Sequence, residues 1–277
     1  ATNPAQGAVK GYSKTMATQK GSAGTSNLVY QTQWDSHGAG DDSVAQVAEE
    51  LSFPNEGSNV AEAFSTKTEY TYFQDDQGND TLQVQQRKTT PPVIPVAQNG
   101  DGQEHPSYEV YDELGRMIWE KDARGYISHW VHDEITGATL RMIADVDTAQ
   151  VSGAPAGWTT PADGGLNLIT DYEVDDQGRT TKSLGPAHEV QLEESDTEAT
   201  WIRTTQFTVH RDDLFETWTA QRYATGEAPS YGFETVGPIS IQRSDASGRT
   251  IDSISSIREC SCGPLKTTET FPQRNWT

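Results

Sequence analysis

The sequence is short of cysteine, of positive charge and of hydrophobic side chains. Of its 277 residues, 2 are cysteine, 20 are lysine or arginine against 41 aspartate or glutamate, and 33% are hydrophobic. The net charge of -21 argues against a nucleic-acid partner, because phosphate contacts need a basic face. No apolar run approaches the roughly 18–20 residues of a membrane-spanning helix, so no membrane span is expected.

The two cysteines, Cys260 and Cys262, are separated by one residue. A disulfide between them would close a very small, strained ring, and a zinc site would need ligands from elsewhere in the chain. The redox state of these cysteines and the redox compartment therefore stay open at this stage.

Aromatic residues, in contrast, are well represented, with 7 Trp, 10 Tyr and 7 Phe. They exclude a disordered acidic tail, which lacks such side chains. The composition is typical of a β-rich protein with a thin core, and we expect an extracellular or cell-surface location. No signal peptide opens the sequence, so we expect that one was removed or lies upstream of an internal piece.

Segments of alternating or β-branched residues, bounded by Gly, Pro or Asp, dominate the chain from residue 27 onward. They predict an all-β fold of stacked β-hairpin repeats, forming a twisted ribbon or solenoid-like sheet with at most one short helix. The helix candidate is residues 41–51, where Val44, Val47, Ala48 and Leu51 have helical spacing. One strand is expected over residues 231–243.

The chain is expected to have two parts. Residues 1–27 are rich in Gly, Ser, Thr, Ala and Gln and predict a flexible or strand-donating N-terminal arm. Residues 28–277 predict the β-repeat domain, with a sub-boundary near the acidic segment 185–199.

An Asp-x-x-Gly phrase recurs after strand-like residues, and Arg or Asn follows the Gly at four places. Asp favours the first position of a type I turn, and Gly supplies the positive φ that closes a hairpin with a bulge. Each phrase therefore predicts one hairpin corner. The pairs are Asp35 and Gly38, Asp75 and Gly78, Asp112 and Gly115, Asp122 and Gly125, Asp175 and Gly178, Asp245 and Gly248, and, with one extra residue, Asp133 and Gly137.

Residues 108–116 read Tyr-Glu-Val-Tyr-Asp-Glu-Leu-Gly-Arg, and residues 121–133 add Asp-x-x-Gly and an aromatic strand. This pattern resembles the YD repeats of the RHS-repeat family, with degenerate copies at residues 70–79, 171–179 and 243–249. The resemblance covers about residues 66–271, with long insertions, and His132 stands where Tyr is usual. It implies a secreted or surface-exposed β-structure, which in long members winds into a shell around a toxin cargo and in others serves adhesion.

No catalytic motif stands out, and a non-enzymatic role is expected. His129 and His132 lie three apart on a predicted strand, which makes them poor co-ligands of one metal. Calcium is the one cation with a candidate site, because Asp75, Asp76, Asn79 and Asp80 gather oxygen donors in one turn. The alternative is a turn whose carboxylate binds its own backbone. No cofactor is required.

Three functional hypotheses follow. The first is a structural protein, or a segment of a YD-repeat protein, that self-associates into a fibre or surface layer through β-edges or exchange of the N-terminal arm. The second is a carbohydrate-binding or adhesion module that uses exposed aromatic residues, with Trp34, Trp158, Trp201 and Trp218 as candidates. The third is a shell fragment of an RHS-type toxin-delivery protein.

Overall fold

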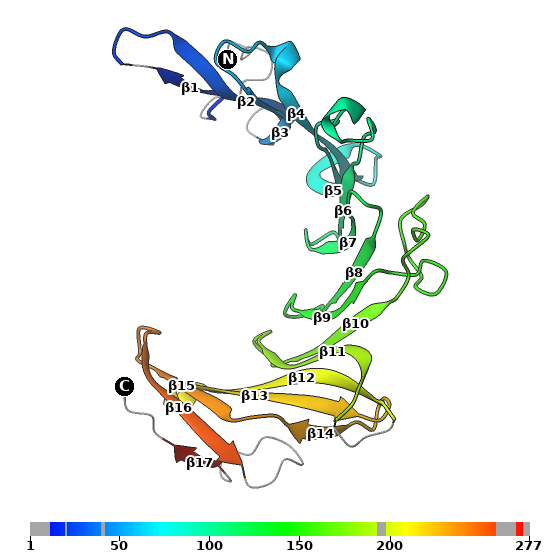
Figure 1. Ribbon diagram of the computed structural model, residues 1–277, viewed down its shortest axis with the longest axis vertical. Coiled ribbons are helices and arrows are strands. Elements are labelled where there is room, and N and C mark those ends of the chain that lie inside the picture. The colour runs from blue at the N-terminus through cyan, green and yellow to red at the C-terminus, as the bar shows by residue number, and fades with distance from the viewer. Residues whose placement is uncertain (1–11, 20, 40–41, 193–197, 259–269, 274–277) are drawn as a thin grey trace. The chain divides into compact units, whose positions relative to one another are not determined.

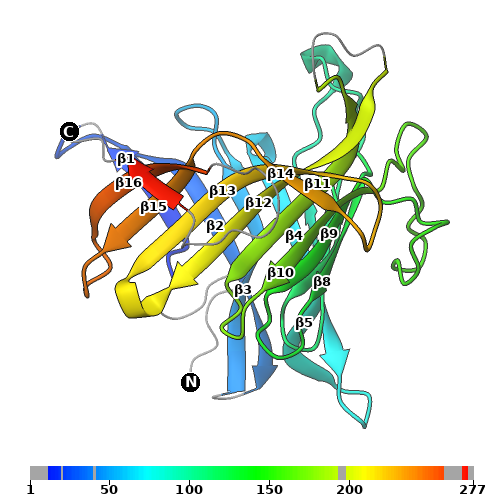
Figure 2. The same ribbon diagram turned by 90° about the horizontal axis from the view of Figure 1, so that it is seen from below.

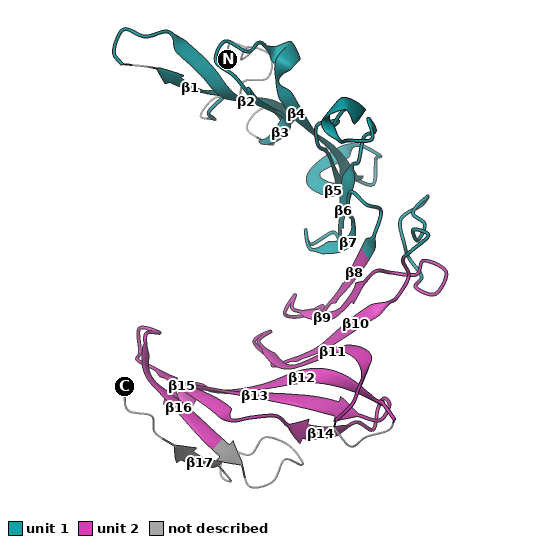
Figure 3. Cartoon of the chain, in the orientation of Figure 1, with its two compact units in different colours: residues 1–127, 152–163 teal, residues 128–151, 164–277 magenta. Residues whose placement is uncertain are grey.

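The computed structural model describes residues 12–19, 21–39, 42–192, 198–258 and 270–273 (Figure 1). The chain forms two compact units (Figure 3). Unit 1 comprises Ala1–Ile127 and Ser152–Asp163, and unit 2 comprises Ser128–Val151 and Gly164–Thr277. The segment 185–199 therefore lies inside unit 2, and the division does not fall at residue 27.

Unit 1 is an antiparallel ribbon in which each strand pairs with the strands before and after it in sequence. Two one-turn 3-10 segments, Val60–Glu62 and Val96–Gln98, lie in its connections. Its strands are β1 (Thr15–Gln19), β2 (Ser26–Ala39), β3 (Asp42–Ser52), β4 (Phe64–Gln74), β5 (Asp80–Thr90), β6 (Ser107–Tyr111) and β7 (Met117–Lys121).

Unit 2 continues with the same antiparallel pattern, and its longest strands, β11 to β13, lie side by side (Figure 2). Strand β13 pairs with β12 along one edge. Along its other edge it pairs with β15 over its first half and with β14 over its second half. A third 3-10 turn spans Asp212–Leu214. The strands are β8 (Ile127–His132), β9 (Thr139–Ala144), β10 (Leu168–Val174), β11 (Thr180–Val190), β12 (Thr200–Arg211), β13 (Glu216–Thr225), β14 (Gly232–Thr235), β15 (Ile239–Ser244), β16 (Thr250–Arg258) and β17 (Thr270–Gln273).

The all-β prediction is confirmed: the described residues contain strands, turns and 3-10 segments but no α-helix. The predicted helix at residues 41–51 is wrong, because its described residues, from Asp42 onward, belong to strand β3, which pairs with β2 from Asp42 to Ser52. Gln33 lies opposite Glu49 and Trp34 opposite Val47, so Ala48 is the extra residue of a β-bulge. The bulge interrupts the two-residue alternation, and the resulting spacing of apolar residues imitates a helix.

Two further expectations need correction. Asp35 and Gly38 do not form a corner, since both lie within β2, opposite Gln46 and Ser43 of β3. The single strand expected over residues 231–243 is two strands, β14 and β15. The break falls at Gly237, which has a φ of 75°, and at Pro238, which cannot donate to a strand ladder.

Part of the N-terminal arm is also a strand. The five residues of β1 are all exposed and pair with β2 of the same chain. The indole Nε1 of Trp34 donates to the Ser13 carbonyl at 2.9 Å, and the ring packs on Tyr12. Residues 12–19 are therefore held against β2 by main-chain and aromatic contacts.

The apolar core is thickest in unit 2. A contiguous buried cluster on β13, β15 and β16 contains Trp218, Ala220, Ile239, Ile241 and Ile254, with Val209 of β12 packed against it. These residues alternate along their strands, so one face of each strand is buried and the other faces water.

Candidate functional site

The candidate site is the Asp-x-x-Gly corner, which recurs with one backbone geometry at Asp75, Asp112, Asp122, Asp175 and Asp245. At each, the aspartate N–H donates to the carbonyl four residues later at 2.8–3.0 Å, and the glycine N–H donates to the aspartate carbonyl at 2.9 Å. The five glycines have φ values between 77° and 92°, in the left-handed region that favours glycine. The phrase thus forms a type I turn closed by a glycine bulge.

The aspartate carboxylate completes each corner by binding its own backbone. In all five corners Oδ1 accepts hydrogen bonds from the N–H groups two and four residues later, at 2.8–3.0 Å. Because no other residue type offers an ionised acceptor on so short a side chain, aspartate is the residue that this turn selects.

Three corners carry an arginine after the glycine, and its side chain binds the second carboxylate oxygen. The Nε of Arg116, Arg179 and Arg249 donates to Oδ2 of its corner aspartate at 2.7, 2.7 and 2.8 Å. Such a charge-assisted bond is shorter and stronger than a neutral one. The Asp-x-x-Gly-Arg phrase therefore describes a complete local unit of hydrogen bonds.

In the three corners that carry arginine, the same bonds lower the pKa of the aspartate. Partial burial alone would raise the pKa of Asp112, but backbone and side-chain hydrogen bonds from Arg116 outweigh it and hold the pKa below its usual range. The backbone N–H of Arg249 is the main cause of the lowered pKa of Asp245. The carboxylates are thus held ionised, as acceptors, and are poorly suited to donate a proton.

In the remaining corners, the residue that follows the glycine is not arginine. Asn79 donates its side-chain amide to Asp75 Oδ2 at 3.1 Å, and Tyr126 contributes only its backbone to Asp122. In the longer corner, Asp133 Oδ2 accepts from the backbone N–H of Ile135 and Thr136 and from the Thr136 hydroxyl. Gly137 N–H closes it onto the Asp133 carbonyl at 3.0 Å.

Two corners of unit 2 pack on each other. A Cβ at Gly178 would lie 3.0 Å from Cβ of Thr136, whereas a Cβ at Gly115 would meet open space. Arg179 also reaches the 3-10 turn between β12 and β13, where its two terminal nitrogens bind both carboxylate oxygens of Asp212 at 2.6 and 2.9 Å. Asp212 is a contact that no local pattern indicates, since it lies 33 residues away in sequence.

The four residues of the calcium hypothesis lie in and beside one corner. The Asp75 carboxylate accepts hydrogen bonds from the backbone N–H groups of Gln77 and Asn79. The Asp80 carboxylate accepts from Gln74 Nε2 at 3.5 Å. Among the described residues, no group of three or more His, Cys, Asp and Glu side chains is arranged to hold a metal ion. His129 and His132 both lie on β8, while Cys260 and Cys262 lie outside the described residues.

The candidate tryptophans have different surroundings. Trp218 is buried in the unit 2 core, whereas Trp201 has 59% of its surface exposed. Trp158 packs on Tyr108 within unit 1, and Trp34 on Tyr12. Trp34 and Trp158 belong to unit 1, and Trp201 and Trp218 to unit 2. No helix in the described ranges is long and apolar enough to cross a membrane.

No known protein family matches the chain, and no curated protein matches it. Among solved structures, it is similar to a chain of the "Crystal Structure of TcdB2-TccC3-Cdc42", with 12% sequence identity and a TM-score of 0.23. The alignment covers 88% of the present chain and 15% of that chain. The chain therefore spans a small part of that protein's length, and the likeness is too weak to carry a structural argument.

Proposed function

We propose that the chain is a non-catalytic, extracellular structural segment of a YD-repeat protein, in which it builds a length of antiparallel β ribbon. The observation that supports this most is the complete corner at Asp112, Asp175 and Asp245, where the Asp-x-x-Gly-Arg phrase makes the same set of bonds each time. The carboxylates of this repeated turn are bonded within the turn itself, which fits a structural role. Repeat units of this kind gain stability by pairing with their neighbours.

The ribbon has an edge suited to self-association. Strand β1 pairs with β2 on one side, and its five residues, Thr-Met-Ala-Thr-Gln, are exposed and uncharged. Charged residues and proline are the usual protection of an edge strand, and β1 contains neither. The proposal therefore includes assembly of copies through this edge, into a fibre or a surface layer.

Light scattering and negative-stain electron microscopy of the purified chain test the assembly. We expect particles larger than one chain, whose fraction grows with protein concentration and falls in Thr18→Pro, because proline removes a donor from β1. Thr25→Pro, just before β2, is the control outside β1. A monomer at every concentration would refute assembly through this edge.

The extracellular location has a separate test. An epitope inserted between Gly153 and Ala154, in an exposed connection, should bind its antibody on intact producing cells or in their medium. Labelling that appears only after lysis would refute the location.

A further inference from the structure

Strand β4 begins three residues before its pairing with the following strand does, and this leaves a notch in the ribbon of unit 1. On one side, β4 pairs with β3 from Phe64, which lies opposite Ser52. On the other side, its pairing with β5 begins only at Lys67, opposite Thr90. Phe64, Ser65 and Thr66 therefore have a neighbouring strand on one side alone, and backbone groups on the other side are open to a ligand.

Two prolines create the notch. Pro91 and Pro92 follow the last residue of β5, and neither has an N–H group that could continue the ladder. The connection beyond them closes on itself, since Gly100 and Gly102 donate to the carbonyls of Pro95 and Ile94 at 3.1 Å. No described backbone hydrogen bond joins this connection to residues 64–66.

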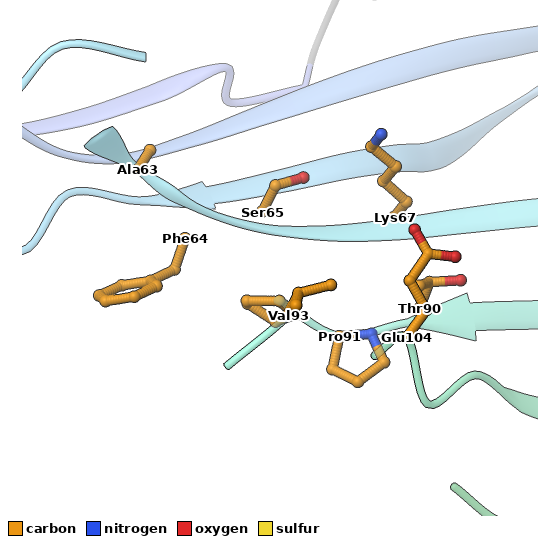
Figure 4. Close-up of a pocket in the computed structure, with 9 residues that line it drawn as sticks. Ala63, Phe64, Ser65, Lys67, Thr90, Pro91, Val93 and Glu104 are labelled. Carbon is orange, nitrogen blue, oxygen red and sulfur yellow. The ribbon is translucent and has the colours of Figure 1, made fainter. Parts of the chain in front are cut away.

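The floor of the notch is partly apolar. A cavity of about 250 Å³ lies there, and its lining includes Phe64, Pro91, Pro92 and Val93 beside polar side chains. Figure 4 shows Phe64, Pro91 and Val93 along one side of β4. Ala63, Phe64 and Val93 also line an adjoining cavity. Phe64 and Val93 keep 43% and 41% of their surface exposed, so both side chains are accessible to a ligand.

The charged groups around this floor are mostly acidic. Glu104 and Lys67 line the first cavity, and Glu56 and Glu62 line the second. Three carboxylates against one ammonium favour a ligand with positive charge.

We propose that the notch binds an extended segment of a partner polypeptide, which adds as a strand beside Phe64–Thr66. The segment places an aliphatic side chain on Phe64 and Val93, and a lysine or arginine two residues along the same strand, on the same face, lies toward Glu104. Main-chain hydrogen bonds supply affinity in this mode of recognition, and the pocket and charges supply the choice of sequence. The site is distinct from the β1 edge on which the proposed assembly depends.

The probe is a fluorescein-labelled hexapeptide, Thr-Val-Thr-Lys-Thr-Thr, which as a strand places its valine and its lysine on one face. Fluorescence polarisation measures its binding to the full chain. Val93→Asp should weaken binding by about tenfold or more, because it places a charge on the apolar contact, and Glu104→Lys by about threefold to fivefold, because it reverses one charge at the rim. The matched controls are Val96→Asp, at a side chain 71% exposed and outside both cavity linings, and Glu113→Lys, at an exposed turn.

Two further probes separate the modes of binding. A peptide methylated on its backbone nitrogens should lose affinity, because it cannot donate to β4, and a peptide with glutamate in place of lysine should bind at least about tenfold more weakly. The proposal is overturned if the probe does not bind, if methylation leaves affinity unchanged, or if Val93→Asp and Val96→Asp behave alike. Oligomers of the chain that dissolve in Val93→Asp but persist in Thr18→Pro would assign the notch to a second copy, and would also overturn it.

Discussion

Both units contain the same Asp-x-x-Gly corners. The strands that lie between the corners are stabilised by different interactions in each unit. Unit 2 has the buried cluster around Trp218, Ile239 and Ile241. In unit 1, Arg87 of β5 binds Glu109 of β6 at 2.6 Å, and Glu109 also accepts from the Tyr111 hydroxyl of its own strand. The corner therefore does not depend on one kind of core, because its hydrogen bonds are local to five residues.

The difference has an energetic consequence. Apolar burial contributes about 25 cal/mol for each Å² removed from water, whereas a cross-strand polar pair contributes roughly 0.2–1 kcal/mol. We therefore expect substitutions in the unit 2 cluster to cost more free energy of unfolding than single substitutions in the polar pairs of unit 1.

The largest effect is expected for Ile239→Ala in unit 2. Ile239 is 0% exposed, and truncation of such a side chain leaves a cavity that costs about 3 kcal/mol of unfolding free energy. Ile251→Ala is the control, because Ile251 lies on β16 with 66% of its surface exposed and should cost less than about 0.5 kcal/mol. Urea unfolding followed by tryptophan fluorescence measures both. Equal costs would mean that the cluster is not the core of unit 2.

A second comparison places alanine at the same backbone conformation in both units. Gly115 in unit 1 and Gly178 in unit 2 both have a φ of 77°, so each substitution should cost about 1–2 kcal/mol for the left-handed conformation. Gly178→Ala should cost more in the same urea assay, because its new Cβ would lie 3.0 Å from Thr136. A smaller cost at Gly178 would contradict the packing of the two corners of unit 2.

The smallest effect is a gain of stability in unit 1. Glu120 lies opposite Glu109 on the neighbouring strand, and burial, then Glu109 and Asp122, raises its pKa above the usual 4.5. Glu120→Gln should therefore stabilise the protein at pH 7 by about 0.5 kcal/mol, because it removes a like-charge pair. Glu113→Gln, at an exposed turn position, is the control.

The pH dependence of that gain follows from the sign of the shift. A carboxyl group with a raised pKa in the folded state costs stability when it ionises, so the cost is full at neutral pH. It vanishes as the pH falls through the raised pKa and below 4.5. The advantage of Glu120→Gln should therefore disappear in acid; an advantage that persists there would have another cause.

The local part of the fold could be predicted from the sequence. An aspartate three residues before a glycine determines its own hydrogen bonds, so the corners at Asp112 and Asp175 need no distant information. Asp35 and Gly38 show where this fails: the same phrase lies within β2 because pairing with β3 continues through it. Strand pairing over ten residues outweighs the preference of one turn.

Features that depend on distant residues could not be predicted. The bulge at Ala48 is defined by its register against Gln33 and Trp34, and without that register its apolar spacing favours a helix. The notch beside Phe64 depends on the different lengths over which β3 and β5 pair with β4. The prolines after β5 indicate only that this strand ends. They do not indicate that residues 64–66 of β4 lack a neighbouring strand on that side.

The central claim is that the corner aspartates act as acceptors for their own backbone. Amide hydrogen exchange of the wild-type protein and Asp112→Ala measures this directly, because Leu114 and Arg116 donate to Asp112 Oδ1 at 2.9 Å. Exchange at these two amides should be at least about tenfold faster in Asp112→Ala. At Gln177 and Arg179 it should stay unchanged, and added calcium should leave the wild-type rates as they are. Unchanged exchange at Leu114 and Arg116, or wild-type protection that appears only with calcium, would contradict the account.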